Sequence, residues 1–470
     1  MTVTANTPDK RPNRLAAFAR NDEGGLVVLS LFLFICMMLA VGLAIDVMRT
    51  EMARTRLQNT VDSAVLAAAS MEQTMDPTVV VEDYFEKAGL SNQLEGVQVV
   101  QGVNHKTVTA HTNTKMPMYF LGMVGIDEME AKSTGTATSG FTDVEISLVL
   151  DISGSMREQA SSGGQTKIEH LRTAASSFVD IVINTEQPGT VSVSLVPYTA
   201  QVNASAGIMD RLNVSREHSF SSCVDFEQSD FDETGISMST SYDHMEHFQA
   251  YYSSTNPIDN PGCPNRSFEE IIPFSENITE LKAAINQYQP RANTAIHLGM
   301  KWGVGLLDPQ FKPLIADMAL SGEVDPAFAG RPYAYGRDNT TKVIVLMTDG
   351  KNVNTTRLKP QYYDTAEEIA RWNEYSLSQW ASAHGTNWSN YAVTKYTASQ
   401  ADSMLDNICT AAKAAKITIY TIGVEVSSHS AGVMKSCATS PSHYFDIEGE
   451  EMTDTFASIA RQISTLRLTN

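Results

Sequence analysis

The sequence predicts an α/β protein with a doubly wound, mainly parallel sheet, preceded by one transmembrane helix, a helical stalk and a small α+β domain. Three patterns support this prediction: an uncharged apolar run, then a stretch of alternating polar and apolar residues, then strands that alternate with helices. The expected divisions are a cytoplasmic tail at 1–24, the span at 25–45, the stalk and small domain at 46–140, and the α/β domain at 141–470.

The composition restricts the class of partner. The 470 residues include 34 Lys and Arg against 54 Asp and Glu, which gives a formal net charge of −20. Proteins that bind nucleic acids need clustered cationic side chains to contact the phosphates. Beyond a short basic cluster at the N-terminus, this sequence has no basic stripe. We therefore expect no nucleic-acid partner.

The apolar run at residues 25–45 carries no charge. About 20 apolar residues in a helix cross the roughly 30 Å hydrocarbon layer, so we expect an uncleaved transmembrane helix. A cleaved signal peptide, cut near residues 42–44, is the alternative, but its apolar region is usually shorter and here a helical pattern continues. The basic cluster between Lys10 and Arg20 favours an inside N-terminus, with everything after Asp46 outside.

The helical pattern beyond the span predicts a long stalk. Its apolar residues recur close to helical period, at Val47, Met48, Met52, Leu57, Val61, Val65 and Ala68. Farther on, residues 97–102 and 106–114 alternate like a hairpin, 118–125 are expected to be helical, and 129–139 read as a returning strand. Together these segments predict a small α+β domain.

The region beyond residue 141 alternates between strand and helix. The expected strands lie at residues 144–150, 190–198, 341–349, 417–426 and 442–447. The expected helices lie at residues 167–183, 293–307, 401–416 and 454–467. This order predicts parallel strands with crossover helices, and such sheets bind ligands outside the carboxyl ends of their strands. Two long irregular stretches, at about 203–290 and 351–400, interrupt the pattern.

Five cysteines bear on the compartment. Cys36 lies in the expected span, and the other four form an even set. Four cysteines allow three pairings, and closeness in sequence favours Cys223 with Cys263 and Cys409 with Cys437. An oxidising compartment lets disulfides persist, which agrees with a domain outside the membrane. Four buried thiols in a cytosolic domain are the alternative.

One set of oxygen-bearing residues points to a metal. Asp151 ends the first strand and is followed by Ser153 and Ser155; Asp349 ends a later strand, and Thr294 stands where a helix is expected to begin. Parallel strands bring their ends to one edge, so two carboxylates and three hydroxyls would converge there. Hard oxygen donors suit Mg²⁺, or Mn²⁺ and Ca²⁺, rather than zinc. The alternative is that Asp151 and the serines only cap a helix or shape a turn.

This set resembles the metal-ion-dependent adhesion site of the von Willebrand factor A domain, in which D-x-S-x-S, a lone Thr and T-D-G hold a divalent ion. The resemblance covers nearly all of the α/β region, with the two irregular stretches as insertions. It implies that Ser153, Ser155 and Thr294 ligate the ion directly, while Asp151 and Asp349 act largely through water. It also implies that an acidic side chain of a protein partner completes the ion's shell.

The N-terminal part, from "EGGLVVLSLF" to "DSAVLAAAS", resembles TadE/TadG-like proteins of the Flp, or tight-adherence, pilus assembly system, and the closing "ASIARQISTLRLT" is similar to the end of TadG-like chains. The resemblance implies a single-pass protein of the bacterial inner membrane with a periplasmic C-terminal domain and protein partners in the pilus machinery. Prepilin-type processing requires Glu five residues after a Gly; after Gly25 that position is Ser30, so a permanent anchor is expected.

Binding rather than catalysis is the expected function. A phosphohydrolase-like site needs a second carboxylate two residues after Asp151, where Ser153 stands, and the lysine nearest a motif is Lys351. His297 and His443 are expected to be packing or hydrogen-bonding residues. A surface-exposed adhesin is the alternative within the binding class, and a metal-dependent hydrolase is the alternative outside it.

The two insertions offer a further hypothesis. The second begins directly after Asp349 and the first returns to Thr294, so both are rooted at the ion's edge of the sheet. We expect them to form a rim around the ion, with Trp and Tyr side chains as partner anchors. The alternative is that these aromatic residues form a small covering core.

Overall fold

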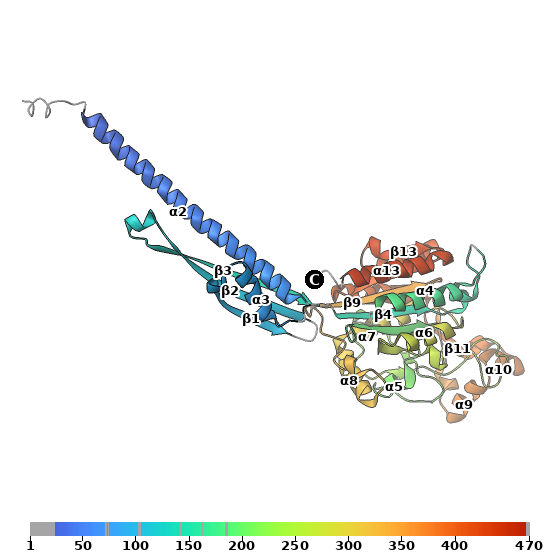
Figure 1. The fold of residues 1–470 in the computed structure, drawn as a ribbon. Helices are drawn as coiled ribbons and strands as arrows, with labels where there is room; N and C mark the ends of the chain where they lie inside the picture. Colours follow the sequence, from blue (N-terminus) through green and yellow to red (C-terminus); the bar gives the residue numbers. More distant parts are fainter. Residues whose placement is uncertain are drawn as a thin grey trace, which may run out of the picture. The chain divides into compact units, whose positions relative to one another are not determined.

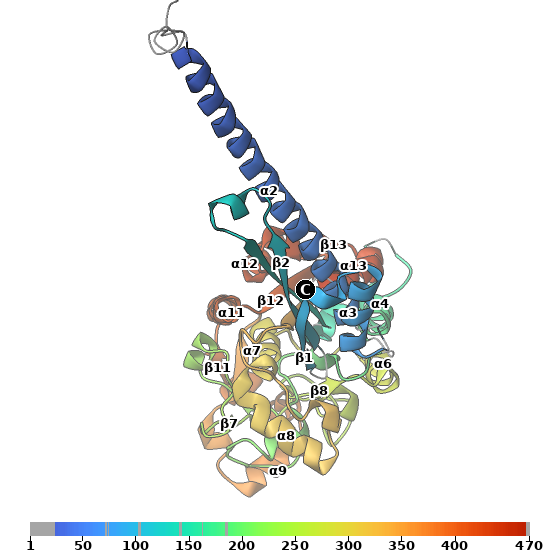
Figure 2. The same ribbon diagram turned by 60° about the vertical axis from the view of Figure 1, so that its left-hand side comes forward.

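The structure is a computed structural model that describes residues 24–70, 73, 75–101, 105–140, 143–161, 163–183 and 187–466. The chain divides into two compact units, Met1–Gly140 and Phe141–Asn470. Figures 1 and 2 label most of the helices and strands of both units.

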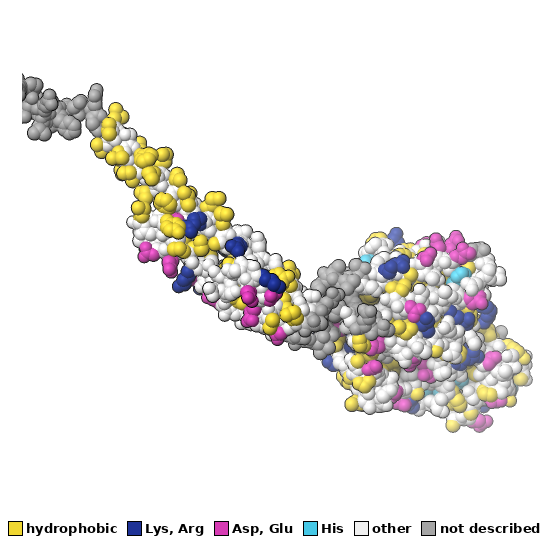
Figure 3. All heavy atoms as spheres, viewed as in Figure 1, with side chains coloured by type: hydrophobic (Ala, Val, Ile, Leu, Met, Phe, Trp, Pro, Cys, Tyr) yellow, Lys and Arg dark blue, Asp and Glu magenta, His cyan; other side chains and the backbone are white. Residues whose placement is uncertain are grey.

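The first unit is built on one continuous helix, α2 (Gly24–Ala69), so the expected continuation of the helix beyond the apolar run is confirmed. Within the described residues it is the one helix long and apolar enough to cross a membrane. Large apolar side chains between Leu26 and Ile45 lie exposed along it, and they form the yellow surface of the helix in Figure 3. Inside a membrane such side chains face lipid rather than water.

The stalk half of α2 has its apolar packing over its last turns, whereas nearer its start the polar residues Asp46 and Thr50 are buried. Leu57, Val61 and neighbouring apolar residues are buried against α3 (Pro77–Lys87) and the adjoining sheet. Gly135 permits this approach, because a Cβ at that position would lie 2.2 Å from Val61 Cγ1. Three residues of the predicted helical pattern, Val47, Met48 and Met52, are 47–63% exposed, whereas its later residues, from Leu57 to Ala68, are buried.

The sheet of the first unit is antiparallel, in the order β1-β2-β3. Its strands are β1 (Leu94–Gln101), β2 (His105–Pro117) and β3 (Glu128–Gly140), which confirms the expected hairpin and returning strand. The expected helix at 118–125 is wrong: it is a single 3-10 turn, η2 (Leu121–Val124). Gly125 ends that turn with a φ of +91°, a left-handed conformation that stops a helix.

The second unit contains a six-stranded sheet in the order β13-β12-β9-β4-β5-β8. The strands are β4 (Asp143–Asp151), β5 (Val191–Tyr198), β8 (Ile272–Ser275), β9 (Thr340–Thr348), β12 (Thr418–Val424) and β13 (Tyr444–Ile447). All pairs are parallel except β5 with β8, an antiparallel edge strand that the sequence did not predict. The five expected strands are confirmed, and central β4 is buried along its whole length.

Helices cover both faces of this sheet (Figure 1). One core joins alternate β4 residues to α4 (Lys167–Val182), α6 (Ile278–Gln287) and α13 (Met452–Leu466). The core on the opposite face joins Val149 to α7 (Ile296–Leu307) and α11 (Ala398–Ala414). The four expected helices are confirmed; α6, α8 (Lys312–Ser321) and α12 (Ser428–Cys437) were not predicted.

Glycines bring α7 unusually close to the sheet. A Cβ at Gly303 would lie 2.5 Å from Val149 Cγ2, and a Cβ at Gly299 would lie 2.6 Å from Tyr198 Cδ1. The glycine-bearing face of α7 therefore rests directly on β4 and β5. This contact sets the start of α7, and with it Thr294, at the carboxyl ends of the strands.

The two insertions are not irregular throughout. Short elements occur in them: β6 (Val224–Asp225), β7 (Asp243–His244), β10 (Thr355–Leu358), α9 (Ala366–Glu374), α10 (Leu377–Ala383) and β11 (Ala392–Tyr396). Apolar residues of both insertions share one cluster that includes Met245, Phe248, Leu358, Tyr363 and fully buried Trp372. The covering core is therefore confirmed for these aromatic residues, and for them the rim hypothesis is wrong.

Both expected disulfides are present. Cys223 and Cys263 are 2.00 Å apart at sulfur, and Cys409 and Cys437 are 1.96 Å apart. The first closes a segment of the first insertion, and the second joins α11 to α12. Cys36 is exposed on α2 and free.

Candidate functional site

The expected site lies where two neighbouring strands end. β4 and β9 pair in parallel with Leu150 opposite Met347, so Asp151 and the Thr348–Asp349 turn leave the sheet side by side. Two backbone hydrogen bonds hold the loop before Thr294 against the loop after Asp151: Arg291 N–H to the Ile152 carbonyl at 3.0 Å, and Gly154 N–H to the Ala292 carbonyl at 3.2 Å. A Cβ at Gly154 would lie 2.9 Å from that Ala292 carbonyl, so the approach requires glycine.

All five predicted residues are brought together by one chain of hydrogen bonds. The Thr294 hydroxyl donates to Ser153 Oγ at 2.9 Å, and Ser153 Oγ lies 3.2 Å from Ser155 Oγ. The Ser155 hydroxyl donates to Asp349 Oδ1 at 2.6 Å. Asp151 joins the set through Oδ1, which accepts the Ser153 backbone N–H at 2.8 Å. The structure thus places the residues together as the sequence predicts; whether they hold an ion stays a prediction.

The carboxylates of the set are buried. Asp151 is fully buried, and its Oδ2 accepts the Thr348 hydroxyl at 2.7 Å. In the described part of the chain, no cationic side chain lies within ion-pair distance of Asp151. Burial, and then the negative charge of Asp349, raise the pKa of Asp151. Burial also raises the pKa of Asp349, against the opposing effects of Ser155 and Lys167.

Lys167 supplies positive charge to one side of the set. Its side chain is 6% exposed, and its Nζ lies 3.3 Å from Asp349 Oδ2, 3.6 Å from Glu425 Oε2 and 3.7 Å from Glu158 Oε2. Lys167 was not among the residues predicted from the sequence; the lysine considered there was Lys351, which is exposed. The sequence does contain a signal for the position of Lys167. Thr166 and Glu169 form a capping box that starts α4 at Lys167, and a helix that follows the first strand begins near the carboxyl end of that strand.

The donor set fits a hard divalent cation. Of the two buried carboxylates, only Asp349 pairs with an ammonium group of the described residues, that of Lys167, which leaves local negative charge, and the remaining donors are hydroxyl oxygens. Three of the five side chains in the set are hydroxyls, and among the described residues there is no group of three or more His, Cys, Asp and Glu that could hold a metal. Zinc, which prefers nitrogen and sulfur ligands, suits it poorly.

Asn352 is a second residue that the sequence reading missed. Its Oδ1 accepts the Ile296 backbone N–H at 2.7 Å at the start of α7, and lies 3.1 Å from His297 Nδ1. The Val353 N–H donates to the Thr294 carbonyl at 3.2 Å. The loop after Asp349 therefore fixes the backbone that presents Thr294.

The two histidines have local roles. Burial lowers the pKa of His297 to about 4, so it is a neutral partner of Asn352. His443 Nδ1 lies 2.7 Å from Ser440 Oγ. These contacts agree with the expected packing and hydrogen-bonding roles.

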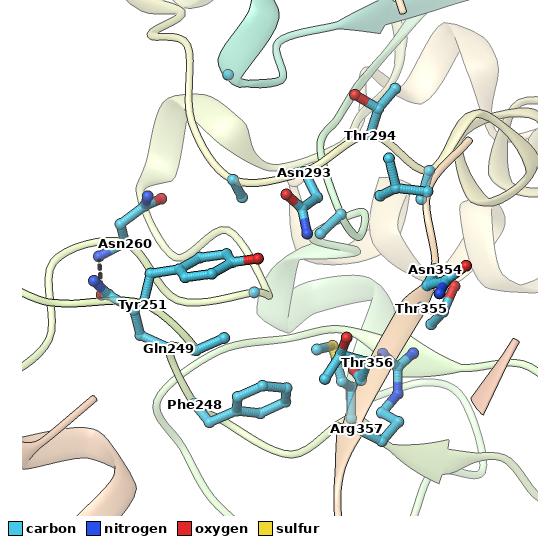
Figure 4. Close-up of a pocket in the computed structure, with 18 of the residues that line it drawn as sticks. Phe248, Gln249, Tyr251, Asn260, Asn293, Thr294, Asn354, Thr355, Thr356 and Arg357 are labelled. Carbon is cyan, nitrogen blue, oxygen red and sulfur yellow. Dashed lines mark hydrogen bonds between the residues drawn. The ribbon is translucent and has the colours of Figure 1, made fainter. Parts of the chain in front are cut away.

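A pocket of about 230 Å³ lies beside Thr294 (Figure 4). Both insertions contribute to it: Tyr251 and Trp388 lie on its wall, and the Tyr251 ring and the Asn293 amide point into it. Tyr251 is 61% exposed and stacks edge-on with Trp388 at 5.8 Å. None of the described residues that line the pocket is Asp or Glu, although the protein is strongly acidic.

Strand β10 presents its edge to the pocket. Five consecutive residues, 353–357, line it, and side chains alternate between faces along a strand. If one face of the strand lined the pocket, only every second residue would contribute, so a run of consecutive residues indicates that the backbone edge of the strand faces the pocket. β10 pairs with β11 on its other side in a two-stranded sheet, so its pocket edge carries no strand among the described residues. Thr355 is 7% exposed, and its Oγ1 has no hydrogen-bond partner among the described residues.

Comparisons with known proteins concern two parts of the chain. Residues 24–71 match the family model described as putative Flp pilus-assembly TadE/G-like. Among solved structures, the vWF domain of the type V pili tip protein Mfa5 from Porphyromonas gingivalis aligns at 16% identity over 71% of this chain and 98% of that chain, with a TM-score of 0.35.

The pilus adhesin SpaC from Lactobacillus rhamnosus GG aligns at 12% identity over 80% of this chain and 35% of that chain, with a TM-score of 0.32. The PilB minor pilin from Streptococcus sanguinis aligns at 12% identity over 80% and 78% of the two chains, with a TM-score of 0.34. No curated protein matches the chain. At these scores the structural likenesses carry no argument about the site.

Proposed function

Starting from an N-terminal segment of the TadE/G-like Flp pilus-assembly type, we propose that this chain is a membrane-anchored protein-binding module, without enzymatic activity, that acts in pilus assembly. The apolar half of α2 anchors it in the bacterial inner membrane, and the second unit is a periplasmic von Willebrand factor A-like domain with a doubly wound sheet. The long exposed apolar stretch of α2 and the two disulfides support this placement.

The hydrogen-bonded chain from Thr294 through Ser153 and Ser155 to Asp349 is the observation that carries the proposed binding role. These residues, with Asp151, hold Mg²⁺, or Mn²⁺ and Ca²⁺. A bound ion offers a position that accepts a carboxylate oxygen from a partner. The burial that raises the pKa values of Asp151 and Asp349 supports this assignment, because a cation offsets the cost of two buried negative charges.

The pocket beside Thr294 indicates how the partner lies. An extended partner segment places its acidic side chain at the ion and runs its backbone along the free edge of β10. Strand addition of this kind uses backbone hydrogen bonds for affinity and pockets for side-chain selection. Tyr251 and Trp388 supply apolar surface for the next side chain. An anionic partner segment is supported by the described lining residues, which include Arg157 and Arg357 but no Asp or Glu.

The experiment is Mn²⁺ titration of the full-length protein in nanodiscs, monitored by electron paramagnetic resonance. Asp151→Asn and Thr294→Ala are expected to weaken Mn²⁺ binding at least about tenfold, a loss of roughly 1.4 kcal/mol. Asp364→Asn, at an exposed position in the second insertion, is the matched control and should bind as the wild type does. Wild-type affinity in both site variants would disprove the ion site.

Partner capture completes the test. The wild type is expected to retain envelope proteins of the pilus machinery in Mg²⁺ and to release them in EDTA, whereas the two site variants retain none. Protease treatment of intact cells separates assembly from adhesion: digestion of the second unit without outer-membrane permeabilisation would indicate the surface-exposed adhesin instead.

A further inference from the structure

The tip of the β2–β3 hairpin lies against the end of the apolar part of α2. The Met118 N–H donates to the Asp127 carbonyl at 2.9 Å and closes the tip. Phe120 packs on Gly42, where a Cβ would lie 2.3 Å from the Phe120 ring. Gly42 belongs to the uncharged run of residues 25–45, so one ring of the tip already stands beside the apolar span.

Asp46 fixes the tip beside the end of the apolar run. It is the first charged residue after the run, and it is fully buried. Its carboxylate accepts three consecutive backbone N–H groups of the tip: Tyr119 at 3.3 Å, Phe120 at 2.7 Å and Leu121 at 2.9 Å. A buried carboxylate with three donors holds this register firmly, because withdrawing the tip would leave the charge without these donors.

The tip exposes large apolar side chains. Tyr119 is 66% exposed, Met123 is 75% exposed and Ile126 is 45% exposed. The Arg49 guanidinium lies 4.4 Å from the centre of the Tyr119 ring. Aromatic side chains and Arg that extend along apolar surface are typical of the membrane–water boundary.

We propose that this tip is a second membrane contact, in which Tyr119, Met123 and Ile126 enter the lipid surface of the same bilayer that α2 crosses. The inference rests on the proposed membrane span. Its geometric basis is that Phe120 and Asp46 hold the tip at the end of the apolar run, where the bilayer surface must lie if that run is the span. With two points in the membrane, α2 and the hairpin fix how the small domain is rotated about the helix.

The test uses single-cysteine labels in a Cys36→Ser background, with the full chain in vesicles of phosphatidylethanolamine and phosphatidylglycerol. Met123→Cys carries an environment-sensitive nitrobenzoxadiazole dye, and some lipids carry a doxyl quencher near the headgroup. At least about twofold quenching with a blue-shifted emission is expected. Val100→Cys is the matched control: Val100 is 61% exposed at the opposite end of the same sheet and should show neither change.

A label at Met38→Cys, inside the apolar run, separates the two claims. Quenching at position 38 by deep doxyl lipids, without quenching at 123, would overturn the tip contact and leave the span intact. No quenching at either position would overturn the span itself. The dye at position 123 could instead be shielded from water without being quenched by lipid. If this occurs together with cross-links between copies of the chain, the tip contacts another chain rather than lipid.

Discussion

Ser155 donates a 2.6 Å hydrogen bond to Asp349, a residue 194 positions later in the chain. Parallel pairing of β4 with β9 makes this contact possible, because both strands end at one edge of the sheet. Neither strand end holds the set alone: one contributes Asp151, Ser153 and Ser155, and the other contributes Asp349. The register of this strand pair therefore brings these four residues together, and Thr294 joins them from the loop before α7.

Removing the Ser155 hydroxyl tests the set with little change to the fold. Ser155→Ala is expected to weaken Mn²⁺ binding roughly tenfold, about 1.4 kcal/mol, because one oxygen donor and the contact to Asp349 are both lost. Ser161→Ala is the control, since Ser161 bonds to Glu425 at 3.0 Å outside the set. Equal affinities for the two variants by calorimetric titration would contradict the role given to Ser155.

In the proposed site, Lys167 and the ion would compete for the carboxylate of Asp349. Lys167→Met is expected to lower the melting temperature in EDTA, because Asp349 loses its cation while staying buried; breaking a buried pair costs on the order of 3 kcal/mol. Mn²⁺ then becomes the main cation available to Asp349, so its addition should raise the melting temperature more in the variant than in the wild type.

The control for Lys167 is Lys282→Met. Lys282 pairs with Asp180 at 2.6 Å on the surface, with its side chain 35% exposed. Exposed pairs contribute little, so this variant should melt close to the wild type in both buffers. An identical response to Mn²⁺ in Lys167→Met and the wild type would show that Lys167 does not act on the ion site.

The sequence predicts the candidate site residues better than the residues that surround them. Asp151 and Asp349 are recognisable because each ends an apolar run, and strand ends are where a parallel sheet presents its ligands. Lys167 and Asn352 are not recognisable in this way, since their roles arise from contacts with other segments of the chain. Trp372 stands in a stretch without clear periodicity, and only the packing of two insertions shows that it is core.

Acid is expected to weaken the first insertion through its histidines. Burial lowers the pKa of His247 to about 4 and that of His218 to about 3; the rings of His218 and His244 lie 3.8 Å apart. Below pH 6.5 the unfolded chain binds protons that these folded histidines do not bind. The free energy of unfolding therefore falls as the pH drops towards 4, by up to about 1.4 kcal/mol per pH unit for each histidine.

Urea denaturation at pH 7 and pH 5 measures this slope, and His247→Asn isolates one contribution. The variant should lose less stability on acidification than the wild type. Glu246 acts in the opposite sense in both proteins, because burial raises its pKa to about 7. The same slope in variant and wild type would contradict the role given to His247.

The Cys223–Cys263 bridge closes a segment of 40 residues that includes pocket residues such as Phe248 and Tyr251. Replacing both cysteines by serine is expected to cost about 4 kcal/mol of stability by loop entropy and to reduce partner capture, with Mn²⁺ affinity unchanged. The Cys409/Cys437 double serine variant is the control: its loop of 28 residues implies a similar stability loss without an effect on capture. Equal loss of capture in both would mean that general destabilisation is responsible.

Thr355 gives the sharpest test of the pocket, because stability and binding should change in opposite directions. Its buried hydroxyl has no partner among the described residues, so Thr355→Val should leave the melting temperature unchanged or raise it. If a partner strand along β10 uses that hydroxyl, capture in Mg²⁺ falls several-fold. Thr421→Val is the control, and the opposite result is expected for it. The Thr421 hydroxyl donates to the Met434 carbonyl at 2.9 Å, so its removal should cost about 1 kcal/mol of stability and leave partner capture unchanged. Undiminished capture by a stable Thr355→Val protein would move the partner away from the edge of β10.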